Sequence, residues 1–95
     1  MENENILYPR YLFRKKLSLI FLEKHINNMS NFLEIGAGSG DFSKTLMKTI
    51  KKGDIIDFSE KATEVLQSKI NNNDIEIICD DFLQYNFQRK YSLYG

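Results

Sequence analysis

The stretch Phe32-Leu33-Glu34-Ile35-Gly36-Ala37-Gly38-Ser39-Gly40 is a short apolar run that stops at three alternating glycines. An apolar run of this length predicts a β-strand, and the glycines let the backbone turn sharply after it. Asp41 then opens a segment in which Phe42, Leu46 and Ile50 recur at the four-residue spacing of a helix. The stretch therefore predicts a strand that leads through a tight turn into a helix. Free N–H groups at the start of that helix could bind a carboxylate.

Strands and helices alternate on both sides of this stretch. The expected elements are a helix over Tyr11–Ile26, strands over Asn31–Ile35, Ile55–Phe58 and Ile75–Cys79, and the start of a fourth strand over Tyr91–Tyr94. Gly53 should end the helix that begins at Asp41, and Ser59 should cap the next one. Its buried stripe should be Ala62, Val65, Leu66 and Ile70, and Asn71–Asn73 should close it in the left-handed conformation. The alternation predicts an α/β fold with a parallel sheet and flanking helices.

Acidic side chains follow two of these strands. The carboxyl ends of parallel strands share one edge of a sheet, so Asp57, Asp81 and the glycine turn should meet there. A carboxylate at Asp57 could accept hydrogen bonds from the two hydroxyls of a ribose, or it could cap the next helix. Asp80 and Asp81 could bind the amine of an adenine that Phe82 covers, or they could form a turn. The residues alone leave both pairs of alternatives open.

With these motifs in place, residues 31–95 resemble the class I S-adenosylmethionine-dependent methyltransferases. Phe32–Gly40 is similar to the first motif of that family, Ile56–Ala62 to the next motif and Ile78–Leu83 to the adenine-contacting motif. The resemblance implies a Rossmann-like sheet that is incomplete, with about four strands of the usual seven. It also implies S-adenosyl-L-methionine as cofactor and methyl transfer to an acceptor as activity. The chain would be a single partial domain over 1–95, with an N-terminal helical segment over 1–30 and a βαβαβ core over 31–95.

The resemblance also implies which residues bind the cofactor. They are Glu34, Gly36, Ala37, Gly38 and Gly40 around its methionine part, Asp57 on the ribose, Phe58 and Phe82 beside the adenine, and Asp81 on the adenine amine. Asp80 is less favoured than Asp81, because the family usually has a small residue before its aspartate. Ser92 stands where the family's fourth strand typically opens with an aspartate, which weakens the match there. The catalytic base, the methyl acceptor and the oligomeric state are not assigned.

Composition bears on nucleic-acid binding, metal binding and membrane association. The chain has 13 basic and 13 acidic side chains, so no net charge attracts nucleic acid, and only the basic segment Tyr8–His25 keeps that partner open. One cysteine and one histidine cannot assemble a thiolate or imidazole metal site. The longest apolar run, Leu19–Leu22, is too short for a membrane span, and the acidic N-terminus is unlike a signal peptide. A cytoplasmic protein is therefore expected.

Two rival functions share part of this pattern. A dinucleotide oxidoreductase would need a third glycine where Asp41 stands, and the negative charge of Asp41 would face the pyrophosphate. We therefore disfavour NAD as the ligand. A truncated remnant or binding module that keeps the sheet without turnover is the other alternative, because the chain stops soon after its fourth strand begins.

Overall fold

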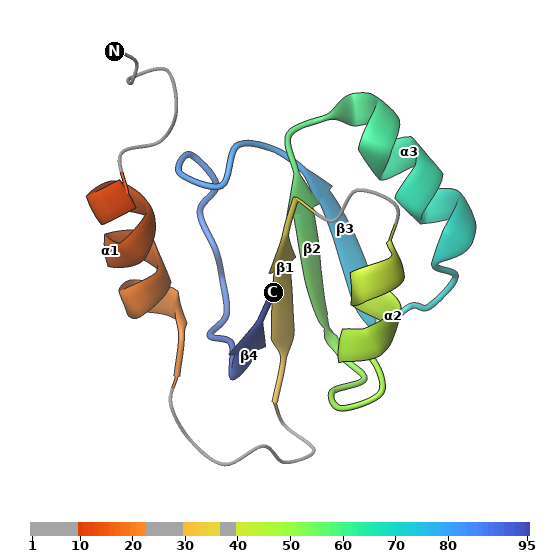
Figure 1. The fold of residues 1–95 in the computed structure, drawn as a ribbon, viewed down its shortest axis with the longest axis horizontal. Helices are drawn as coiled ribbons and strands as arrows, with labels where there is room; N and C mark the ends of the chain where they lie inside the picture. Colours follow the sequence, from red (N-terminus) through yellow and green to blue (C-terminus); the bar gives the residue numbers. More distant parts are fainter. Residues whose placement is uncertain (1–9, 23–29, 37–39) are drawn as a thin grey trace.

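The computed structural model describes residues 10–22, 30–36 and 40–95, and its centre is a four-stranded parallel sheet (Figure 1). The sheet order is β3-β2-β1-β4, with β1 over Phe32–Ile35, β2 over Gly53–Asp57, β3 over Ile75–Cys79 and β4 over Leu93–Tyr94. The helices are α1 over Arg10–Ile20, α2 over Asp41–Leu46 and α3 over Glu60–Lys69. Helices α2 and α3 lie on one side of the sheet and α1 on the other. The predicted α/β class with a parallel sheet and flanking helices is confirmed.

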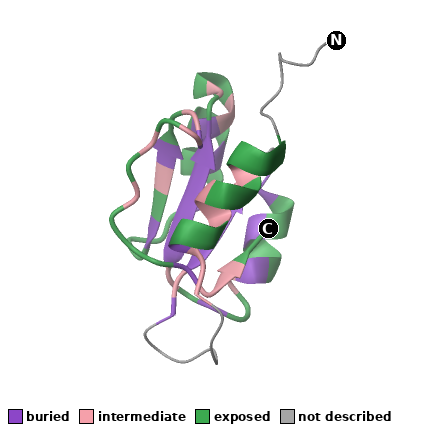
Figure 2. Cartoon of the chain, turned by 90° about the vertical axis from the view of Figure 1, so that its left-hand side faces the viewer, coloured by how far each residue is buried: buried purple, intermediate pink, exposed green. Residues whose placement is uncertain are grey.

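Each face of the sheet carries its own apolar core, and the central strands between the two cores are largely buried (Figure 2). The core under α2 and α3 consists of Phe32, Leu46, Ile50, Ile55, Leu66, Ile70 and Ile75. The core under α1 consists of Ile20, Leu33, Ile56, Ile78, Phe82 and Tyr91, with Phe13 and Leu17 packed against it. Consecutive strand residues alternate between the two cores, as the pleat of a strand requires. Both faces of β1 and β2 are therefore covered, which is typical of parallel sheets.

Gly53 has a different role from the predicted one. Helix α2 ends at Leu46 and a turn follows, whereas Gly53 is the first residue of β2 and pairs with Phe32. A Cβ atom on Gly53 would overlap the carbonyl oxygen of Phe32 and would lie 2.7 Å from its ring. The glycine is required mainly because the backbone carbonyl of Phe32 in the paired strand occupies the place of a Cβ atom, and the Phe32 ring lies close to the same place. The pattern of glycine after a helix had indicated a helix end instead.

The N-terminal helix is shorter than predicted. It ends at Ile20, because Phe21 leaves the helix to form a bridge with Tyr91 and the N–H of Leu22 donates to the carbonyl of Tyr91 at 2.6 Å. The remainder of the predicted helix, 23–26, lies outside the described residues. The fourth strand is also shorter than predicted, because Tyr91 pairs with Phe21 in an isolated bridge outside β4, which begins at Leu93.

Helix α3 begins as predicted and ends differently. The Ser59 side chain accepts a hydrogen bond from the N–H of Ala62 at 3.1 Å, which confirms the cap. No asparagine of 71–73 is left-handed, because the described residues have positive φ only at glycines. Helix α3 ends instead with extended backbone at Ile70. Val65, predicted to be buried, is exposed, and Thr63 takes the buried position.

Candidate functional site

The carboxyl ends of β1, β2 and β3 lie side by side at one edge of the sheet. The N–H of Gly36 donates to the carbonyl of Ile56 at 2.8 Å, and the N–H of Asp80 donates to the carbonyl of Asp57 at 3.1 Å. The chain leaves β1 toward β2 and β3 and returns to β4 on the other side of β1. The end of β1 is therefore the point where the strand order reverses, and ligands of open α/β sheets bind at such points. The predicted meeting of the three strand ends is confirmed.

The two ends of the glycine turn both require glycine. Gly36 has φ +69° and Gly40 has φ +87°, values that side chains with a Cβ rarely adopt. Gly40 is also buried, and a Cβ there would lie 2.9 Å from the side chain of Leu66. Ala37, Gly38 and Ser39, which the sequence assigned to the same turn, lie outside the described residues.

Glu34 links the glycine-turn strand to the helix that follows. Its side chain is buried, and its Oε1 accepts a hydrogen bond from the hydroxyl of Ser43 in α2. Burial raises the pKa of the Glu34 carboxyl, and the hydrogen bond from Ser43 opposes this rise. Sequence reasoning missed Ser43. The sequence signal for it was a serine in the first turn of the helix that follows the strand carrying Glu34.

Asp57 and Phe58 end β2 in different environments. Asp57 is 8% exposed, and its Oδ1 accepts a hydrogen bond from the N–H of Ser59 at 2.9 Å. The capping alternative is therefore present in the structure, although a carboxylate has lone pairs for further donors. Phe58 is 79% exposed, so a large aromatic face is open to solvent next to this carboxylate.

Asp81 begins the turn that follows β3. Its Oδ1 accepts a hydrogen bond from the N–H of Leu83 at 2.9 Å, and its carbonyl accepts from the N–H groups of Gln84 and Tyr85. The turn-forming alternative is thus also present, while Asp81 still lies at the edge where β1 and β2 end.

Phe82 does not lie open to a ligand, although the sequence predicted that it would cover the adenine. Its ring is only 2% exposed and packs 4.9 Å from the ring of Phe13 and 5.6 Å from that of Phe87, measured between centroids. The connection from β3 to β4 contains no helix, so its own aromatic residues cover this face of the sheet. Phe82 is therefore a core residue in this structure and is not available to cover a ligand.

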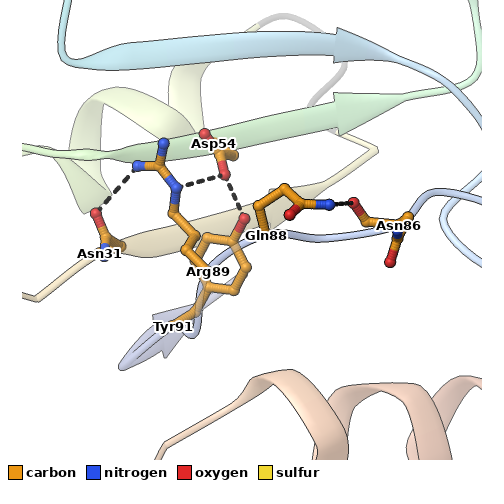
Figure 3. Close-up of polar contacts among 6 residues, drawn as sticks. All are labelled: Asn31, Asp54, Asn86, Gln88, Arg89 and Tyr91. Atoms are coloured by element: carbon orange, nitrogen blue, oxygen red, sulfur yellow. Dashed lines mark hydrogen bonds and ion pairs between the residues drawn. The ribbon is translucent and has the colours of Figure 1, made fainter.

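A second polar cluster lies at the opposite edge of the sheet, around Asp54 (Figure 3). The Tyr91 hydroxyl donates to Oδ2 of this buried carboxylate, and Arg89 Nε lies 3.5 Å from the same oxygen. Arg89 also donates to the side-chain oxygen of Asn31 at 3.4 Å, while Oδ1 of Asp54 has no partner within the described part of the chain. Burial, together with the Asp54 carboxylate, raises the pKa of Tyr91. Sequence reasoning missed this cluster because Asp54 follows a glycine that it read as a helix end.

Two grooves lie away from the glycine turn. One of about 470 Å³ is lined in part by Asp54 and Arg89, and one of about 480 Å³ runs between α1 and the segment 83–87. Within 10–22, 30–36 and 40–95, no three His, Cys, Asp or Glu side chains are placed to share a metal ion. The helices of these same segments are too short or too polar for a membrane span.

Comparisons with known proteins relate the chain to a family of RNA methyltransferases. The family model of ribosomal RNA adenine dimethylase matches residues 11–93. The chain is 29% identical over 97 residues to an rRNA adenine N-6-methyltransferase of Lysinibacillus sphaericus, covering 99% of the chain and 38% of the relative. It is 31% identical over 100 residues to an rRNA adenine N-6-methyltransferase of Limosilactobacillus reuteri, covering 100% of the chain and 41% of the relative. The chain thus spans about two fifths of these relatives.

Solved structures share the fold. The N-methyltransferase NodS from Bradyrhizobium japonicum WM9 superposes with a TM-score of 0.54 at 28% identity, over 82% of this chain and 40% of that one. A structure from Haloferax volcanii, a complex of the Trm112 methyltransferase activator with a putative methyltransferase, gives a TM-score of 0.57 at 19% identity, over 81% of this chain and 33% of that one. These likenesses bear out a Rossmann-like methyltransferase sheet that is present only in part.

Proposed function

Because the chain belongs to the ribosomal RNA adenine dimethylase family, we propose that it carries the S-adenosyl-L-methionine-binding part of an enzyme that methylates adenine in ribosomal RNA. The observation that carries this proposal is the meeting of the glycine turn with the ends of β2 and β3 at one sheet edge. In domain terms, residues 1–95 would be one partial domain, with the helical segment 1–30 preceding the core 31–95.

The residues at this edge fit the chemistry of an adenosyl ligand. The carboxylates of Asp57 and Asp81 are hydrogen-bond acceptors, and ribose hydroxyls and the adenine amine are donors. The exposed ring of Phe58 offers an apolar face for the adenine. The left-handed Gly36 and Gly40 let the backbone approach a ligand closely.

We assign the roles as follows. Asp57 accepts hydrogen bonds from the ribose hydroxyls. Phe58 flanks the adenine, and Asp81 accepts a hydrogen bond from the adenine amine. Glu34 and the turn from Gly36 to Gly40 surround the methionine part. The bound sulfonium supplies an activated methyl group. The protein's own task is then mainly to hold the reacting groups in line and exclude water. Ala37 and Gly38 stay in this assignment as predictions from the sequence.

The acceptor in this proposal is RNA, the partner that net charge had disfavoured. The family description names ribosomal RNA, and on α1 the exposed side chains of Arg10 and Arg14 lie one helical turn apart. Positive side chains on one helix give a local phosphate-binding surface even when the whole chain is neutral. We propose that this face of α1 contacts the RNA backbone.

Isothermal titration with S-adenosylhomocysteine tests the cofactor part of the proposal. We expect the 95-residue chain to bind it and the Asp57→Asn variant to bind about tenfold more weakly, because the amide replaces one acceptor oxygen with a donor. Asp74→Asn is the matched control, since Asp74 is exposed and precedes the amino end of β3. The proposal fails if a folded wild-type chain gives no heat at high micromolar ligand, or if NAD binds more tightly.

Methyl transfer needs a separate measurement. A protein in which residues 1–95 continue as in the longer relatives should transfer label from S-adenosylmethionine to ribosomal RNA. Cofactor binding without any transfer by such a protein would favour the alternative of a binding module.

A further inference from the structure

Lys16 on α1 reaches across to the turn that follows β3. Its Nζ donates a hydrogen bond to the carbonyl of Tyr85 at 2.5 Å. The same nitrogen lies 5.5 Å from the ring centroid of Phe82 and 5.2 Å from that of Phe87. A lysine ammonium within about 6 Å of an aromatic face is attracted by the ring's negative quadrupole. Three groups from one segment therefore surround the charged end of a side chain from another.

The environment of this lysine is unlike that of its neighbour. Lys15 is exposed, whereas Lys16 is partly buried. Burial lowers the pKa of Lys16, and the carboxylates of Asp81 and Asp80 oppose this effect. The two acids at the end of β3 thus lie within electrostatic reach of the ammonium group.

The segment held by Lys16 is the one that shapes the Asp81 turn. Tyr85 donates its N–H to the carbonyl of Asp81 at 2.9 Å, and the Asp81 carboxylate accepts the N–H of Leu83. Tyr85 thus closes the turn through its N–H and is bound to α1 through its carbonyl. Because α1 also packs Phe13 on Phe82, this helix contacts the turn at two points. A change at Lys16 should therefore move the turn that carries the Asp81 carboxylate.

We propose that Lys16 is a positioning residue, which holds the turn from Asp81 to Tyr85 so that the Asp81 carboxylate faces the cofactor's adenine. This inference rests on the proposed function, because it takes Asp81 as an adenine contact. The N-terminal helix would then have a second task besides covering the sheet, namely to set the affinity for the adenosyl group.

The test compares four variants by titration with S-adenosylhomocysteine. Lys16→Met keeps the length of the side chain and removes its charge and donor, so we expect about tenfold weaker binding. Lys16→Arg keeps both and should recover most of the affinity. Lys15→Met removes the same charge at an exposed position and should bind like the wild type. Ile50→Val damages the core on the other face of the sheet and controls for general destabilisation.

A second measurement reads the turn directly. Amide hydrogen exchange of Leu83 and Tyr85, whose N–H groups bond to Asp81, should accelerate in Lys16→Met and stay slow in Lys15→Met. The inference is overturned if Lys16→Met binds like the wild type, or if Ile50→Val weakens binding as much at the same loss of thermal stability. A folded wild-type chain that binds no cofactor overturns the proposed function and this inference with it. Equal binding by wild type and Lys16→Met overturns the inference alone.

Discussion

Replacing Gly53 with alanine should destabilise the protein severely. The added Cβ would overlap the carbonyl oxygen of Phe32 and would lie 2.7 Å from two of its ring carbons. Overpacking that side chains can absorb costs about 1 to 3 kcal/mol. Here the nearest atom belongs to the backbone of the paired strand, so β1 and β2 must separate. We expect a loss of about 3 kcal/mol or more, a large share of the stability of a small domain.

Urea denaturation followed by circular dichroism measures this loss. Gly36→Ala is the matched control, because a Cβ there meets nothing within 4 Å and only the backbone angle, φ +69°, opposes it. That conformation should cost about 1 to 2 kcal/mol. The double variant Gly53→Ala with Phe32→Leu should recover little, since the carbonyl of residue 32 remains in place. The reasoning is refuted if Gly53→Ala costs no more than Gly36→Ala.

Three further predictions concern the buried acid of β1, the Asp54 cluster and the basic helix. Burial raises the folded-state pKa of Glu34 above the ordinary 4.5, so the unfolded state ionises first and the wild type should lose stability relative to Glu34→Gln as pH rises above that value. The prediction is contradicted if the free energies of unfolding of wild type and Glu34→Gln, measured in urea, change equally between about pH 4 and pH 7. Tyr91→Phe leaves the buried Asp54 carboxylate without its hydroxyl donor and should lower the free energy of unfolding by about 2 kcal/mol. An unchanged midpoint of urea denaturation would contradict this. The double variant Arg10→Gln with Arg14→Gln removes two charges from α1. In filter binding to RNA, the slope of log K against log salt concentration should become shallower by about 1 to 2. An unchanged slope would argue against an α1 contact.

Much of the fold could be predicted because local patterns and tertiary structure agree. The third strand was predicted with its observed bounds, Ile75–Cys79, and Ser59 caps α3 as expected. The errors lie where distant residues decide. Gly53 is a glycine because of Phe32 in another strand, and α1 ends early because Phe21 pairs with Tyr91. Neither partner is close in sequence, so no local pattern indicates them.

The candidate site could be located from the sequence only as a set of strand ends. That the ends of β1, β2 and β3 share an edge follows from parallel strands, and the structure confirms it. The direction of each side chain could not be read. Phe82 is buried because the connection after β3 lacks a helix, and the hydrogen bond from Ser43 to Glu34 depends on how α2 packs on β1. The roles of Asp57, Phe58 and Asp81 toward a ligand remain predictions for titration.

The order of strands in the sheet also bears on how the chain folds. Phe32 pairs with Gly53, which is near it in sequence, and with Leu93, which is far away. Closing the longer loop costs more chain entropy, so we expect β1, β2 and β3 to assemble with α2 and α3 before β4 joins. Since Phe21 pairs with Tyr91, the N-terminal helix would dock in the same late step. During synthesis on the ribosome, α1 would then dock on the sheet only after the segment up to β4 has emerged.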